Sequence, residues 1–175
     1  MMSTPSIPKN WLWRADVALP GRAVIFDLDG VLCNAAGRQH FIRSGRKDWK
    51  AFFEACAEDT LIEETARILR LMASDVTVVL LTGRPIEVQS HTLSWLALQD
   101  LPWDLLIMRN RGDYADSTVF KQQSVRTLKA MGHDVRVAFD DDPQNQEMFE
   151  AEGVPCHYRY SGYYEERDAL KSKAN

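Results

Sequence analysis

Apolar runs that end in polar or small residues recur along the chain. They have the sequences AVIFDLDG, VTVVLLTGR, DLLIM, VRVAFDDD and VPCHYRY and cover residues 23–30, 76–84, 104–108, 135–142 and 154–160. Nearly continuous apolar runs of this length are typical of strands that are buried on both faces of a parallel sheet. The pattern therefore predicts a parallel sheet of about five strands.

Between these runs, apolar residues recur at helical spacing. The segments with this spacing are 60–74, 85–100, 117–132 and 143–153. Strands that alternate with helices predict an α/β fold, a three-layer Rossmann-like sheet with helices on both faces. Because no repeat, low-complexity tract or linker divides the sequence, we expect one domain over residues 1–175, with a short helical insert at 33–60 and a C-terminal tail at 161–175.

Polar residues follow the carboxyl ends of three predicted strands. Asp27 and Asp29 end the first run, Thr82 lies near the end of the second, and the triplet 140–142 ends the fourth. In parallel sheets, ligands bind beyond the carboxyl ends of the strands. Carboxylate oxygens without nearby histidine or cysteine favour Mg²⁺ over zinc. A second interpretation makes one aspartate of the triplet the cap of the helix that starts at Pro143.

Composition and charge exclude several classes of protein. The chain is 45% hydrophobic and 26% charged, which is typical of a globular protein rather than a disordered one. Its net charge of −4 argues against coating nucleic acid by bulk charge but permits a local basic patch. Three scattered cysteines and the lack of an apolar stretch of membrane-spanning length predict a cytoplasmic protein with reduced thiols and no membrane contact.

The segment 33–60 mixes basic and aromatic residues, and two interpretations are open. Phosphate contacts and stacking surfaces of this kind suit a single-stranded nucleic-acid end. An amphipathic helical hairpin would instead pack its aromatic residues on the core and leave its charges in solvent. Helical spacing favours packing for the aromatic residues, whereas the arginines fit both interpretations. The residues concerned are Arg38, His40, Phe41, Arg43, Arg46, Lys47, Trp49, Lys50, Phe52 and Phe53.

The ordered set of polar residues resembles the four motifs of haloacid dehalogenase-like (HAD) phosphatases. The matching residues are Asp27, Asp29, Gly30, Thr82, Lys121, Asp140 and Asp141. By this resemblance, Asp27 is a nucleophile that forms an aspartyl-phosphate, and Asp29 protonates the leaving oxygen and then activates water.

The same resemblance assigns the remaining roles. Thr82 and Lys121 would hold the phosphate oxygens. Mg²⁺ would be held by the carboxylates of Asp27, Asp140 and Asp141, with the backbone carbonyl of Asp29. Neither the insert at 33–60 nor the stretch between Arg84 and Lys121 can hold a full cap domain, so we expect an open site that admits a large substrate.

A closer resemblance is to the 3′-phosphatase domains of phage-type polynucleotide kinases. It rests on Thr82-Gly83-Arg84 and on Arg109, Asp113, the Asp-Asp pair and the final strand. It implies substrate binding by Gly83, Arg84, Arg109 and Asp113, and we add Arg38 and Arg43 from the insert. Asp142 stands where that family has an arginine, and the absence of a P-loop motif argues against kinase activity.

We therefore expect a Mg²⁺-dependent phosphomonoesterase that acts on a nucleic-acid 3′-phosphate. One alternative is a small-molecule or nucleotide phosphatase of the same superfamily. Another is a phosphoaspartate receiver module, which also combines aspartates, a threonine and a lysine. The motif order argues against a receiver, because the triplet 140–142 follows the lysine and comes after the fourth predicted strand.

Overall fold

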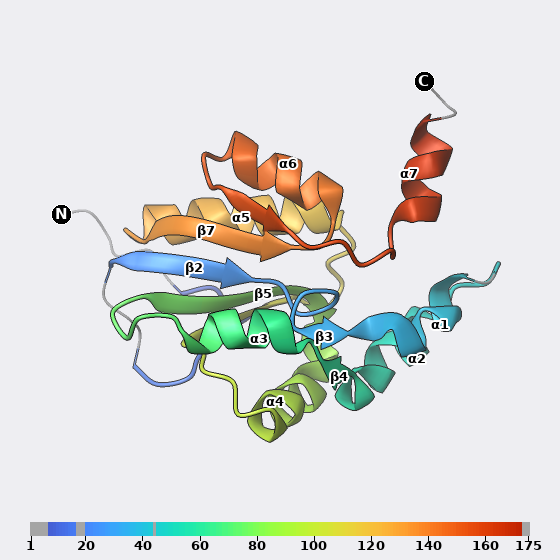
Figure 1. Ribbon diagram of the computed structural model, residues 1–175, viewed down its shortest axis with the longest axis horizontal. Coiled ribbons are helices and arrows are strands. Elements are labelled where there is room, and N and C mark those ends of the chain that lie inside the picture. Colours follow the sequence, from blue (N-terminus) through green and yellow to red (C-terminus); the bar gives the residue numbers. More distant parts are fainter. Residues whose placement is uncertain (1–6, 17–19, 44, 173–175) are drawn as a thin grey trace.

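The computed structural model describes residues 7–16, 20–43 and 45–172 and centres on a six-stranded sheet (Figure 1). The strand order is β1-β6-β5-β2-β7-β8, and each neighbouring pair except β1–β6 is parallel. The predicted parallel sheet is confirmed for the five strands other than β1. The strands are β1 (Trp11–Trp13), β2 (Arg22–Phe26), β5 (Thr77–Pro85), β6 (Leu105–Arg109), β7 (Asp134–Asp140) and β8 (Cys156–Tyr158).

The edge strand β1 is an addition to the sheet of about five parallel strands that the sequence predicts. It pairs antiparallel with β6, with Trp11 opposite Ile107, and Asn10 Nδ2 donates to Met108 O over 2.7 Å. Three residues are too few to show a strand periodicity, so the sequence pattern gives no sign of this strand.

Helices cover both faces of the sheet, as predicted (Figure 1). Alternate strand residues point to opposite faces. Phe26 belongs to the core cluster under α3 and α4, and Ile25 belongs to the cluster under α5 and α6. The helices are α3 (Glu63–Arg70), α4 (Gln89–Leu98), α5 (Ser117–Ala130) and α6 (Pro143–Ala151), with the short η3 (Ile86–Val88) before α4.

A small insert lies beyond the carboxyl end of β2, where the helical insert at 33–60 is predicted (Figure 1). It consists of β3 (Cys33–Asn34), η1 (Ala35–Arg38), α1 (His40–Arg43), α2 (Trp49–Glu54), η2 (Ala55–Glu58) and β4 (Thr60–Leu61), and β3 pairs with β4. The tail contains α7 (Glu165–Ser172), and its residues 173–175 lie outside the described part. None of the helices described here is both long and apolar enough to span a membrane.

Candidate active site

Asp27, Lys121 and Asp140 form the centre of an acidic group at the carboxyl edge of the sheet. Asp27 follows β2, Lys121 lies in α5, and Asp140 is the last residue of β7, the strand beside β2. Lys121 Nζ lies 2.9 Å from Asp27 Oδ2 and 2.6 Å from Asp140 Oδ2, and all three side chains are buried. One ammonium group is thus shared by two carboxylates from neighbouring strands.

Asp141 adds a third carboxylate to this group. Ligand atoms of Asp27, Asp140 and Asp141 all lie within 4.8 Å of one another. Within the described residues, Asp141 Oδ2 is buried without a hydrogen-bond partner. Gly30 lies against this oxygen with φ +82°, and a Cβ at that position would overlap it. A buried, unpartnered oxygen in an all-carboxylate set suits a hard cation, so the residues fit the predicted Mg²⁺.

The protonation equilibria of this group reflect its excess of negative charge. Burial raises the pKa of Asp27 to about 7, although the Lys121 ammonium opposes the shift. Burial and the charges of Asp27 and Asp140 raise the pKa of Asp141 well above its usual range. Burial alone would lower the pKa of Lys121, but Asp140 and Asp27 outweigh it and raise that pKa. A bound cation would relieve this repulsion.

Asp29 lies in a different environment, between two arginines. Its Oδ1 accepts hydrogen bonds from Arg38 over 2.5 Å and from the Nε and terminal nitrogens of Arg84 over 3.0 Å and 2.5 Å. Burial by itself would raise the pKa of Asp29, but the charges of Arg84 and Arg38 outweigh it and hold the pKa below its usual value. Asp29 is therefore an ion-paired carboxylate in this structure.

Asp59, which sequence reasoning missed, completes this second group. It accepts hydrogen bonds from Arg38 over 2.7 Å and 2.9 Å and from Arg84 over 3.2 Å, and its backbone carbonyl accepts one from Trp95 Nε1 over 2.7 Å. Ligand atoms of Asp29, Cys33 and Asp59 also lie within 4.8 Å of one another. Two guanidinium groups already balance the two carboxylates here, so this group has no excess charge for a cation to relieve.

Apart from Lys121 in α5, the residues predicted to contact phosphate include Thr82, Gly83 and Arg109, at the ends of β5 and β6. Thr82 is 1% exposed, and its Oγ1 accepts from Arg84 N over 3.2 Å. Arg109 Nε donates to Gly83 O over 3.3 Å and thereby joins the two strand ends. Asp113 holds the following loop, because its carboxylate accepts from Ala115 N over 3.0 Å.

Three residues of the final segments reinforce the loop after β7, and sequence reasoning missed their roles. Asn145 Nδ2 donates to Asp140 Oδ1 over 3.0 Å. Arg167 of α7 makes a double hydrogen bond to Asp142, with distances of 2.7 Å and 2.6 Å, and the Tyr164 hydroxyl lies 3.5 Å from Asp141 Oδ1. Asp142 also caps α6 by accepting from Gln144 N, which confirms the capping interpretation for one aspartate of the triplet.

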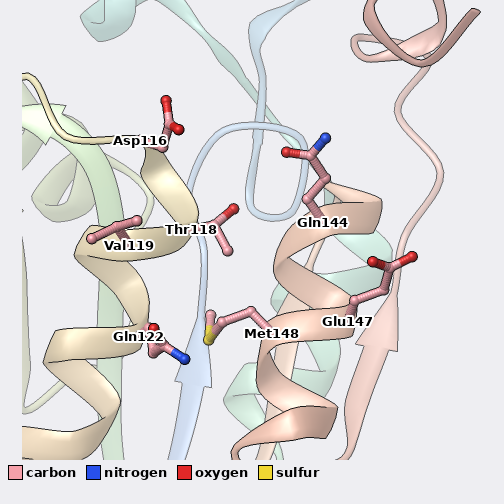
Figure 2. Close-up of a pocket in the computed structure, with 7 residues that line it drawn as sticks. All are labelled: Asp116, Thr118, Val119, Gln122, Gln144, Glu147 and Met148. Atoms are coloured by element: carbon pink, nitrogen blue, oxygen red, sulfur yellow. The ribbon is translucent and has the colours of Figure 1, made fainter. Parts of the chain in front are cut away.

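A groove of about 530 Å³ lies between α5 and α6 (Figure 2). The described residues that line it contain no lysine or arginine, and they include two acids, so the groove does not suit an anionic phosphate group. The acidic edge of the sheet has the cation that this groove lacks, Lys121, and stays the candidate phosphate site. The lining residues are Asp116, Thr118, Val119, Gln122, Gln144, Glu147 and Met148.

The structure brings the predicted acids and their basic partners into two groups, and Arg109 donates to Asp113 O over 3.4 Å. Arg43 is exposed at the end of α1, and Asp113 lies in the loop between β6 and α5. Arg38 and Arg84 are near Asp29 but are 2% and 0% exposed, with their guanidinium groups engaged by carboxylates. Substrate binding by these residues stays a prediction.

The family model that matches residues 21–164 identifies a HAD-type phosphatase domain, and solved structures of low identity share the fold. A putative phosphoglycolate phosphatase from Lactobacillus plantarum shares the fold, with a TM-score of 0.56 at 12% identity, and the alignment covers 84% of this chain and 90% of that one.

Residues 21–164 match the family model of the polynucleotide kinase PNKP phosphatase domain, and the chain belongs to this family. A chain of the Pnkp1/Rnl/Hen1 complex is 28% identical with a TM-score of 0.68, and the alignment covers 81% of this chain and 46% of that one. A chain of the Pnkp1/Rnl/Hen1 RNA repair complex is 27% identical with a TM-score of 0.67, with 84% and 45% covered. The chain thus spans less than half the length of these two chains.

Proposed function

We propose that the protein is a Mg²⁺-dependent phosphomonoesterase that hydrolyses nucleic-acid 3′-phosphate ends through an aspartyl-phosphate. The observation that carries the proposal is the buried group in which the Asp27 carboxylate meets Lys121, Asp140 and the unpartnered oxygen of Asp141. Bound to these carboxylates, Mg²⁺ would offset the repulsion between the nucleophile and an anionic phosphate.

The chain's own residues carry the steps of the reaction. Asp27 attacks phosphorus, the bond to the leaving oxygen breaks, and the phosphoryl group passes to the Asp27 carboxylate. Lys121 and Thr82 hold the phosphoryl oxygens, and Lys121 keeps Asp27 and Asp140 close together.

Asp29 moves protons in both halves of the reaction. Its ionised, arginine-paired state suits a base that takes a proton from the water attacking the aspartyl-phosphate. In the first half Asp29 takes up a proton from solvent, once substrate binding weakens its ion pairs with Arg38 and Arg84, and gives this proton to the leaving oxygen.

Three observations support a nucleic-acid end as the substrate. The chain belongs to the PNKP phosphatase family, similar chains occur in an RNA repair complex, and the insert after β2 is small.

Three unpaired cysteines support a reducing, cytoplasmic compartment.

Phosphate release measured with and without Mg²⁺ tests the proposal. We expect Asp27→Asn to lower the turnover of p-nitrophenyl phosphate at least about a thousandfold while the protein still unfolds cooperatively. Retained turnover in this variant would contradict the nucleophile assignment. We expect wild type to prefer a 3′-phosphorylated oligonucleotide, and a clear preference for mononucleotides would instead establish the alternative nucleotide phosphatase.

A further inference from the structure

The surface of α1 and α2 combines exposed positive charge with an exposed tryptophan. We call Arg43, Arg46, Lys47, Trp49 and Lys50 the α1–α2 platform. All five residues are exposed, and Trp49 has 49% of its surface in solvent. Both helices belong to the insert beyond the carboxyl end of β2, the end of the sheet where Asp27 and Asp29 lie (Figure 1).

Trp49 is held firmly although it is exposed. Its ring lies edge-on to Phe52 with centroids 5.8 Å apart and stacks on Phe53 with centroids 5.9 Å apart. Phe52 is buried and anchors this aromatic group. A large aromatic ring that packs against other rings and is also exposed to solvent is suited to stacking on a planar partner.

The positive charge of the platform contrasts with the acidic chain around it. The chain has a net charge of −4, yet residues 43–50 contain four basic residues and one acid, Asp48, whose carboxylate caps α2 by accepting from Ala51 N. Lys50 lies 3.8 Å from Glu54 in a solvent-exposed pair. Among the described residues, no carboxylate pairs with Arg43, Arg46 or Lys47, and Lys47 Nζ lies 5.8 Å from the centroid of the Trp49 ring.

A short chain of contacts joins the platform to the candidate active site. The Arg38 guanidinium lies over the Phe52 ring, 4.3 Å from its centroid, and donates to Asp29 over 2.5 Å. Trp49 therefore rests on the ring that supports the partner of Asp29. Phe52 and Arg38 are both buried, so the platform and Asp29 are linked through packed side chains.

We propose that the α1–α2 platform binds the single-stranded nucleic acid that precedes the 3′-phosphate. Trp49 stacks on a base, and the four basic residues contact phosphodiester groups. The inference rests on the proposed 3′-phosphatase function and adds to it a binding surface for the body of the substrate. Stacking distinguishes this partner from an acidic peptide, which would use the charges alone.

Steady-state kinetics tests the platform with p-nitrophenyl phosphate and a 3′-phosphorylated ten-nucleotide strand. For Trp49→Ala we expect the ratio of kcat/KM for the strand to that for p-nitrophenyl phosphate to fall about tenfold, mainly through KM. Trp49→Phe, which keeps a stacking ring, should restore most of this ratio. Arg46→Ala combined with Lys47→Ala should lower the ratio and flatten its dependence on salt.

The matched control is Arg136→Ala, because Arg136 is an exposed cation on β7 outside the insert, and this variant should keep the wild-type ratio. Equal ratios in wild type and all platform variants would overturn the inference while leaving the 3′-phosphatase intact. If wild type releases phosphate from mononucleotides but not from the strand, the proposed function fails and the platform with it. Polyglutamate and an unphosphorylated strand are compared as inhibitors. Stronger inhibition by polyglutamate, lost in the Arg46 and Lys47 variant but kept in Trp49→Ala, would overturn the assignment to nucleic acid.

Discussion

Asp27 and Asp29 are separated by one residue but lie in opposite electrostatic surroundings. Asp27 shares one lysine with Asp140 and lies beside Asp141, and burial raises its pKa to about 7. Asp29 shares two arginines, Arg38 and Arg84, with Asp59. These arginines hold the pKa of Asp29 below its usual value, although burial opposes the shift. Asp27 and Asp29 both follow β2, but their side chains contact different partners.

The charge balance of the two groups explains why only one of them suits a cation. Three carboxyl groups and one ammonium leave the Asp27 group with excess negative charge, whereas two carboxyl groups and two guanidinium groups balance around Asp29. A cluster of acids therefore indicates a metal site only after its basic neighbours are known. The structure supplies these neighbours from α5 for one group and from η1 and β5 for the other.

Removing Lys121 is expected to have the largest effect on the Asp27 group. Lys121→Met leaves three buried carboxyl groups without their ammonium, and loss of one partner from a buried ion pair destabilises a protein by about 3–5 kcal/mol. Urea unfolding without metal measures this loss. Added Mg²⁺ should recover part of the stability, and an unchanged unfolding midpoint without metal would contradict the shared role of Lys121.

Removing Arg84 tests the balanced group in the same way. Arg84 is fully buried between Asp29 and Asp59, so Arg84→Met should destabilise the protein by about 3 kcal/mol, and Mg²⁺ should not recover this loss. Arg84→Lys should not restore wild-type stability, because a lysine cannot replace the forked donors. Full recovery by Mg²⁺ would show that both groups bind the cation.

The pH dependence of stability distinguishes the two aspartates. The folded-state pKa of Asp27 is raised from 3.8 to about 7, so its contribution is fully present below pH 3.8 and is lost as the pH rises through about 7. The pKa of Asp29 is lowered, so its contribution is present above its usual pKa and is lost as the pH falls.

Without metal, Asp27→Asn should therefore be more stable than wild type at pH 8, by on the order of a few kcal/mol, and this difference should shrink as the pH falls toward 4. Thermal unfolding in chelator across this range measures the difference. A constant difference at all pH values would mean that Asp27 stays ionised throughout.

The smallest expected effect concerns α7. Arg167 is partly exposed, so Arg167→Ala should lower stability by no more than about 1 kcal/mol even though its double hydrogen bond to Asp142 is lost. Because Asp142 follows the candidate ligands Asp140 and Asp141, we also expect the Mg²⁺ concentration for half-maximal activity to rise several-fold. Arg136→Ala serves as the control, because Arg136 is an exposed arginine near the start of β7, whose last residue is Asp140.

The sequence predicts the Asp27 group better than the Asp29 group, for a physical reason. Asp27, Asp140 and Asp141 follow apolar strands, and the parallel sheet brings such strand ends together. Asp59 and Arg38 lie in the insert, and their pairing is set by how η1 and η2 pack, which leaves no periodic signal. The Arg167–Asp142 pair likewise depends on the placement of α7, and β1 is too short to show a pattern.

Calorimetric titration with Mg²⁺ tests the central claim most directly, because it asks which group takes the cation. We predict that wild type binds Mg²⁺ with release of protons near pH 7, since Asp27 is partly protonated there. Asp140→Asn should abolish binding at the same concentrations, whereas Asp59→Asn, a matched change in the balanced group, should retain it. Retained binding in Asp140→Asn together with loss in Asp59→Asn would contradict the account.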